Sequence, residues 1–237
     1  MSANITIGET ITCSYTKPVN GYLRSQNTGI ALLSFTNFPI KNMTLAYYKI
    51  TDTMTGSAWT RLNAHTPDVG GAWTENTGAW YIGSATANKS LAYTPATQHF
   101  VTQALLSPNV DMKVDVTDFN NGFLVHRGGL CFRYKDNSNN WRLELVHTGN
   151  GADWHLELMK NGTKVGSDYV VTGMGAGNTK TMRILSNGSS IKAYWDNSAT
   201  PCFDITDSAN LSELKFGLAS YCNSTGTGVI FDNLYVH

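Results

Sequence analysis

The sequence predicts an all-β protein whose main part is one antiparallel β-sandwich. Thr, Asn, Ser, Gly, Tyr and Trp are common and Lys, Glu and Pro are scarce, a composition that suits pleated strands joined by tight turns. Many short strand patterns recur with turn signals between them, and no segment has the pattern of a long helix. We expect a small β-rich module at residues 1–56, followed by the sandwich at residues 57–237.

Three strand patterns support the N-terminal module. Residues 5–15 alternate loosely between apolar and polar side chains, and stronger apolar and β-branched runs follow at residues 29–38 and 43–51. The small polar residues from Asp52 to Ser57 are typical of a domain boundary. We therefore expect residues 1–56 to form a separate module suited to attachment or assembly.

The strand pattern of the sandwich is clearest at residues 110–117. Four apolar residues there alternate strictly with polar ones: Val110, Met112, Val114 and Val116. This period of two is typical of a half-buried strand, so its apolar face must meet a second sheet.

The strands that follow are predicted to form hairpins. Residues 129–134, 141–146 and 154–159 are separated by turn-rich segments and predict a meander. The pair Asn161-Gly162 is the strongest short hairpin signal in the chain. A further hairpin is expected across the turn at residues 186–190.

The charge balance argues against two classes of partner. The chain has 17 basic and 17 acidic side chains, so no surplus of either sign attracts it to nucleic acid or to anionic lipid. It lacks an apolar run of about 20 residues, the length that spans a bilayer, and it lacks the basic start and apolar stretch of a signal peptide. We expect no nucleic-acid partner, no membrane partner and no export by that route.

The cysteines do not predict a metal site. Cys13, Cys131, Cys202 and Cys222 show no CxxC or Cys/His spacing of the kind that binds zinc. Buried thiols are expected, and a pairing of Cys202 with Cys222 across neighbouring strands stays open.

Several segments, in order along the chain, resemble a known superfamily. They are Gly70–Trp80, Asp111–Val116, Gly129–Leu145, Met182–Asp196, Lys215–Tyr221 and Phe231–Val236. Together they resemble the concanavalin A-like lectin/glucanase superfamily, especially its laminin-G-like jelly-roll branch, over roughly three-quarters of the chain. The resemblance implies an antiparallel jelly-roll β-sandwich. Such sandwiches occur in glycan-binding modules, in domains appended to glycosidases and lyases, and in adhesion or structural domains of phage particles.

The carboxylates do not follow the pattern of the superfamily's glucanases, which place Glu-x-Asp-x-x-Glu on one strand. Glu144 and Glu157 are each the lone acid of a predicted strand. If these strands are neighbours, the two carboxylates face one another beside Arg142 and His155. We interpret the four residues as a cross-strand charged ladder on an exposed face, and we expect no enzymatic activity.

A glycan site on this fold needs aromatic rings that stack on pyranose rings, with polar groups that bind hydroxyls. Trp73, Trp80 and Tyr81, beside Gly-rich turns, are the predicted stacking residues. The predicted polar residues of the site are Arg142, Glu144, His155 and Glu157. Trp141 and Trp154 share the parity of neighbouring leucines and are expected in the core.

No cofactor is predicted to be required, but the resemblance implies a structural calcium ion. Relatives hold such an ion with oxygen ligands between the opening segment and the last strand. The positions carried over to this chain are Asp68 and Asp232. The ordinary interpretation of Asp232 is a turn or strand residue on an exposed face.

Two functions follow from these observations. The first is a non-enzymatic virion structural protein of a tailed phage, a capsid decoration (cement) or fibre-associated subunit whose lectin-like sandwich is exposed for adhesion. Its partners would be other copies of itself, commonly as a trimer, and major capsid or other virion proteins at the virion surface. The alternative is a secreted, extracellular carbohydrate-binding module, or an accessory domain of a polysaccharide-degrading enzyme, with polysaccharide as its partner. An open aromatic platform favours the alternative.

Overall fold

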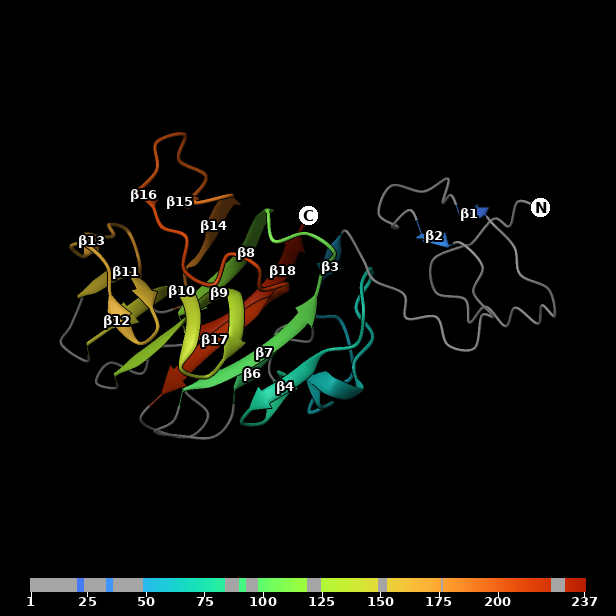
Figure 1. The fold of residues 1–237 in the computed structure, drawn as a ribbon. Coiled ribbons are helices and arrows are strands. Elements are labelled where there is room, and N and C mark those ends of the chain that lie inside the picture. Colours follow the sequence, from blue (N-terminus) through green and yellow to red (C-terminus); the bar gives the residue numbers. More distant parts are fainter. Residues whose placement is uncertain are drawn as a thin grey trace.

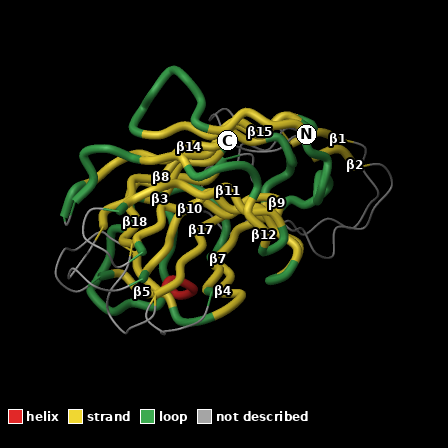
Figure 2. The backbone as a smooth tube through the Cα atoms, turned by 90° about the vertical axis from the view of Figure 1, so that its left-hand side faces the viewer, coloured by secondary structure: helices red, strands yellow, loops and turns green. Residues whose placement is uncertain are grey.

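The computed structural model describes residues 21–23, 33–35, 49–83, 90–92, 98–118, 125–148, 153–175, 177–222 and 229–237. Within these ranges the protein is a jelly-roll sandwich of two antiparallel sheets, which confirms the predicted fold class (Figure 1). A short 3-10 turn, η1 (Leu62–Ala64), appears red in Figure 2 among strands and loops.

Sheet I runs in the spatial order β12, β11, β10, β9, β17, β7 and β4, with β13 also paired to β11. The bounds of its strands are β4 Thr74–Thr77, β7 His99–Ala104, β9 His126–Asp136, β10 Asn139–His147, β11 Trp154–Lys160, β12 Thr163–Lys164, β13 Tyr169–Val170 and β17 Lys215–Cys222. The predicted meander is confirmed, because β9, β10 and β11 lie side by side (Figure 1).

Sheet II runs in the order β16, β15, β14, β8, β18, β6 and β5, with β3 also paired to β18. The bounds of its strands are β3 Ile50–Asp52, β5 Trp80–Ile82, β6 Ser90–Ala92, β8 Val110–Asp118, β14 Thr179–Asn187, β15 Ser190–Trp195, β16 Phe203–Thr206 and β18 Val229–Val236. Two further strands, β1 (Gly21–Leu23) and β2 (Leu33–Phe35), pair with each other.

The core lies between the two sheets and follows the predicted alternation. On β8 the side chains of Val110, Met112, Val114 and Val116 are buried, whereas Lys113 is exposed. Trp141 and Trp154 also belong to the core, as their parity predicted. Burial of each of these valine and methionine side chains of β8 contributes about 1.5–3 kcal/mol to folding.

The predicted hairpins are present with the expected turn chemistry. Asn161 and Gly162 join β11 to β12 with φ values of 49° and 80°, the left-handed conformations that a type I′ turn requires at both central residues. Strands β14 and β15 pair across the turn that contains Gly188, which has a φ of 53°.

One strand of the sandwich precedes the predicted domain boundary. Strand β3 pairs with β18 through Ile50↔Val236 and Leu234↔Asp52, so residues 50–52 belong to sheet II although we assigned them to the N-terminal module. The predicted strand at residues 5–15 lies outside the described residues. A separate module at residues 1–56 stays a prediction, with its C-terminal limit moved ahead of β3.

Two cysteines are described as free thiols, Cys131 and Cys202. Cys131 is fully buried, and burial raises the pKa of its thiol above the ordinary value, so the thiolate that reacts with oxidants and metals is disfavoured. Cys13 and the side chain of Cys222 lie outside the described residues. Among the residues that are described, no helix has the length and apolar character needed to cross a membrane.

Candidate functional site

The four residues of the predicted charged ladder lie together on the outer face of sheet I. Glu144 on β10 stands directly opposite Glu157 on β11, and Arg142 and His155 lie on the same face of these strands. The prediction that this face is exposed is wrong, because the four residues are only 0 to 8% exposed. The ladder is therefore a buried polar network on the side of the sheet that faces away from the core.

Small residues on the neighbouring strands explain why this face can close. In the cross-strand rows, Gly129 and Ala219 separate Glu144 from Phe100, and Cys131 and Gly217 continue the row of Arg142. The Arg142 guanidinium lies over the Phe100 ring, 5.6 Å from its centroid. The long Arg142 side chain can thus lie along the sheet surface, because the neighbouring residues in its row are small. Alternation alone does not predict this contact.

Glu144 is the most perturbed carboxyl group of this network. Burial raises its pKa above the ordinary value, and the charges of Arg142 and Arg127 offset this in part. Arg142 Nε is 3.4 Å from Glu144 Oε1, and among the described residues neither atom has a hydrogen-bond partner of good geometry. Arg142, Arg127 and the Gln98 side chain favour the ionised form of Glu144, but less than burial disfavours it.

Replacing Glu144 with Gln is expected to remove a loss of stability that the wild-type protein shows as pH rises. Because the folded-state pKa is raised, the folded protein holds this proton more tightly than the unfolded chain, so stability falls as pH rises from the ordinary value of 4.5 through the raised one. The variant lacks this fall, so its free energy of unfolding relative to wild type should rise between pH 4 and pH 8. Urea unfolding of both proteins from pH 4 to 8 measures the difference, and a difference that does not change with pH contradicts the prediction.

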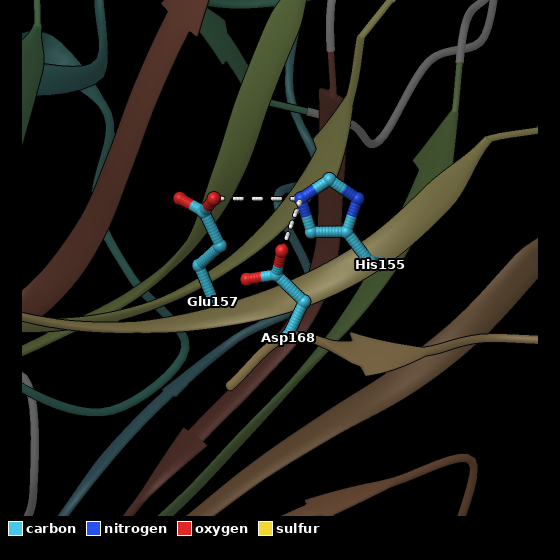
Figure 3. Close-up of side chains that lie close together, drawn as sticks. All are labelled: His155, Glu157 and Asp168. Carbon is cyan, nitrogen blue, oxygen red and sulfur yellow. Dashed lines mark hydrogen bonds and ion pairs between the residues drawn. The ribbon is translucent and has the colours of Figure 1, made fainter. Parts of the chain in front are cut away.

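A second cluster joins the edge of this network to the turn before β13. His155, Glu157 and Asp168 bring one ligand-type atom each within 4.8 Å of one another (Figure 3). His155 Nε2 lies 3.4 Å from Glu157 Oε1 and 3.9 Å from Asp168 Oδ2. Among the described residues, these three side chains form a group that could bind a metal ion.

The surroundings of this cluster do not fit a calcium ion. Arg127 Nη1 is 2.6 Å from Glu157 Oε2, and Lys164 Nζ is 2.7 Å from Asp168 Oδ1. The two carboxylates are thus already matched by two cations. Calcium takes six to eight oxygen ligands, whereas this cluster offers two carboxylates and an imidazole. We interpret it as a charge-balanced ion-pair network.

The two predicted calcium ligands are not brought together with a third. Asp68 Oδ2 accepts a hydrogen bond from the backbone N–H of Thr53 at 2.8 Å. Asp232 Oδ1 accepts one from the backbone N–H of Asn233 at 2.8 Å. Within the described part of the chain neither belongs to a group of three ligand-type side chains. The calcium ion stays a prediction.

Two of the three predicted stacking residues are in the core. Trp73 and Trp80 are 3% and 0% exposed, so their rings do not fit the predicted stacking role. Trp73 is held inward by the buried carboxylate of Asp52, which accepts a hydrogen bond from its Nε1 at 2.7 Å. On β5 the alternation turns Trp80 inward, against Phe231, and leaves Tyr81 half-buried.

The half-buried Tyr81 lies beside an aromatic residue that the sequence analysis missed. Trp59 is 50% exposed and is the most exposed aromatic side chain among the described residues. Its ring packs edge-on against Tyr81, with centroids 5.9 Å apart. The Arg61 guanidinium lies over the other ring, 5.3 Å from the Tyr81 centroid. We call Trp59, Arg61, Glu75 and Tyr81 the aromatic platform.

The backbone holds the platform in place. The segment that carries Trp59 is joined to β5 by hydrogen bonds from Trp59 N to Ile82 O and from Ile82 N to Thr60 O, both 2.9 Å. Trp59 has a φ of 64°, an unfavourable conformation for a bulky side chain that is often found at functional sites. A fixed, exposed tryptophan loses little conformational entropy when it binds a ligand.

Polar groups border the platform. Arg61 Nε is 3.2 Å from Glu75 Oε1, and a second bond joins Arg61 Nη2 to Glu75 Oε2. This bidentate pair raises the pKa of Arg61 and links β4, at the edge of sheet I, to the segment that precedes η1. The Glu75 side chain is only 5% exposed, whereas that of Arg61 is 42% exposed. An indole face beside a fixed guanidinium is a combination that can bind the apolar face and the hydroxyls of a sugar.

A signal for Trp59 was present in the sequence. Trp59 follows the small polar residues at the predicted boundary, and we used these residues only as a boundary. Its exposure depends on a loop that is hydrogen-bonded to β5. The loop and β5 are separated by about 20 residues, so periodicity within one segment does not reveal this contact.

No family model matches this sequence, and no curated protein matches it significantly. Solved structures do match. A GH43 protein, BlXynB, from Bacillus licheniformis has a TM-score of 0.54 at 11% identity, over 86% of this chain and 41% of its own. A xylan β-1,4-xylosidase from Bacillus halodurans has a TM-score of 0.54 at 12% identity, over 87% and 41%.

A carbohydrate-binding module, CBM66, from Bacillus subtilis has a TM-score of 0.48 at 20% identity, over 68% of this chain and 92% of its own. This chain covers less than half the length of the BlXynB and xylan β-1,4-xylosidase chains. At these identities the two matches with TM-scores of 0.54 show a shared fold and nothing further. That shared fold agrees with the antiparallel β-sandwich predicted from the sequence.

Proposed function

We propose that this chain is a non-catalytic carbohydrate-binding module that holds a saccharide on the aromatic platform. The observation that carries the proposal is Trp59, a half-exposed indole fixed beside Tyr81 and the Arg61–Glu75 pair. The apolar face of a pyranose ring stacks on such an indole, and the partly exposed Arg61 guanidinium, held by Glu75, supplies donors for hydroxyls. We expect the module to act outside the cell, where polysaccharide is found.

Burial supports binding over catalysis. The two carboxyl groups that face one another on sheet I, Glu144 and Glu157, are 0% and 8% exposed. A glycosidase needs two carboxyl groups on either side of the scissile bond, in contact with substrate. The absence of enzymatic activity stays a prediction, tested by incubation of the protein with the polysaccharides named below and measurement of reducing ends.

The virion role has no support in the structure or in the comparisons, so we do not carry it forward. Self-association, a trimer and capsid partners stay predictions from the sequence. The platform favours the alternative named at the start, since a monomeric glycan-binding module needs an open aromatic surface.

Replacing Trp59 with Ala is expected to weaken polysaccharide binding by at least about 20-fold, because truncation of an anchoring tryptophan costs about 2 kcal/mol or more. Affinity electrophoresis and titration calorimetry with arabinoxylan, mixed-linkage β-glucan, galactomannan, polygalacturonate and alginate measure it. Trp59→Phe should retain part of the affinity, because it keeps a ring for stacking.

The matched control is Tyr169→Ala. Tyr169 is also an exposed aromatic residue, at 39%, but it lies on β13 at the opposite edge of sheet I. This change should leave binding unaltered. If Trp59→Ala binds as wild type does, or if the full chain binds no polysaccharide of the panel, the proposed function is wrong.

A further inference from the structure

A shallow hollow of about 620 Å³ opens on sheet I. Its walls are the turn between β9 and β10, the first residue of β17, and Asn76 of β4. The volume is in the range of small-molecule sites. Asn76 directly follows Glu75 of the platform, where the pairing of β4 with β7 is irregular. The Asn76 side chain bonds Thr102, whereas the Glu75 side chain bonds Arg61. The hollow and the platform therefore both include residues of the edge strand β4.

The hollow carries a local positive charge although the whole chain is neutral. Lys135 and Lys215 line it together with one acid, Asp136. The lysine ion pairs of the described residues are made by Lys160, Lys164, Lys180 and Lys192. The ammonium groups of Lys135 and Lys215 thus have no carboxylate partner among the residues that the structure describes.

Asp136 offsets one of the two lysine charges, so the hollow keeps one net positive charge. It accepts hydrogen bonds from the backbone N–H groups of Ser138 and Asn139, at 2.8 and 2.9 Å, and from the Asn139 side chain. These bonds, the Asn139 side chain first, and the charge of Lys135 hold the pKa of Asp136 below its ordinary value. They also fix the turn that presents Lys135.

Two amide groups in the wall have their orientation fixed by neighbours. Asn137 Oδ1 accepts a hydrogen bond from the buried Tyr134 hydroxyl at 2.6 Å, which leaves its amide N–H groups for a ligand. Asn76 Nδ2 donates to Thr102 Oγ1 at 2.8 Å, which leaves its carbonyl oxygen. The hollow thus offers one oriented donor, one oriented acceptor and two cations.

We propose that this hollow binds the carboxylate of an acidic sugar, so that the module selects uronate-containing polysaccharides. The proposal rests on the proposed function and names its substrate class. The lysines take the carboxylate, and the amides of Asn76 and Asn137 take neighbouring hydroxyls. A saccharide chain lying across β4 contacts the hollow with one residue and the aromatic platform with another.

The test compares polysaccharides that differ only in charge. Polygalacturonate, alginate and glucuronoxylan are each titrated into the full chain beside their carboxyl-reduced counterparts. At low salt we expect at least one charged form to bind about 5-fold or more tightly than its reduced form, and the preference should shrink at high salt. Equal binding of the charged and reduced forms in all three pairs overturns the proposal.

The variant Lys135→Ala/Lys215→Ala should lower affinity for the charged form about 3- to 10-fold and leave affinity for the reduced form unchanged. The matched control, Lys113→Ala/Lys192→Ala, removes the same charge from sheet II and should keep the preference. A preference that survives in Lys135→Ala/Lys215→Ala contradicts the proposal.

The two proposals fail in different ways. If the reduced forms bind through Trp59 and charge makes no difference, the hollow is not a uronate site but the platform stands. If binding depends on the two lysines and not on Trp59, the hollow stands and the platform does not. If no polysaccharide binds in either form, both proposals are wrong.

Discussion

Replacing Arg133 with Met is expected to lower the free energy of unfolding by about 3 kcal/mol. Arg133 lies on β9 of sheet I and is fully buried. Its guanidinium donates to Asp207 O at 2.9 Å, to Ser186 Oγ at 2.9 Å, and to Gly188 O. These acceptors belong to β14 and to the turns of sheet II, so one side chain joins the two sheets by hydrogen bonds. Methionine has similar volume but leaves the acceptors buried and unpaired.

Urea unfolding at pH 7 measures this loss, with Arg183→Met as its matched control. Arg183 is also an arginine with a fixed partner, Asp111, at 2.7 Å from its Nε, but its side chain is 42% exposed. Exposed pairs contribute about 0–1 kcal/mol, so the control should stay within about 1 kcal/mol of wild type. Equal losses in the two variants would show that the Arg133 bonds across the sandwich add nothing.

Replacing Gly217 with Ala is expected to destabilise the protein by about 3 kcal/mol or more. A Cβ atom at this position would lie 2.0 Å from the carbonyl oxygen of Val101 and 2.9 Å from Thr102 Cα. Both are backbone atoms of β7, and Gly217 is paired with Thr102 across the sheet. No rotamer change relieves the overlap, so β17 and β7 must move apart and lose ladder hydrogen bonds.

Gly175→Ala is the control for this prediction. A Cβ atom at Gly175 would lie 3.5 Å from Asn178 Nδ2, an ordinary contact, so unfolding should change by less than about 1 kcal/mol. Thermal and urea unfolding of both variants decide the matter. A Gly217→Ala protein as stable as Gly175→Ala would mean that β7 and β17 can separate at little cost.

Much of the fold followed from local patterns in the sequence. The alternation at Val110–Val116 and the Asn161-Gly162 hairpin are properties of neighbouring residues, since side-chain direction in a strand has a period of two and a type I′ turn needs two positive φ values. The parity of Trp141 and Trp154 with nearby leucines placed both rings in the core for the same reason. These features need no knowledge of the partner strand.

Only the tertiary structure decided which polar and aromatic residues are open to solvent. Alternation correctly put Arg142, Glu144, His155 and Glu157 on the outer face, but it did not show that the small residues of β9 and β17 let long side chains cover that face. Alternation also did not show that Asp52 holds Trp73 inward, or that a loop hydrogen-bonded to β5 exposes Trp59. Exposure depends on which segments distant in sequence lie above a residue, and periodicity within one strand carries no information about them.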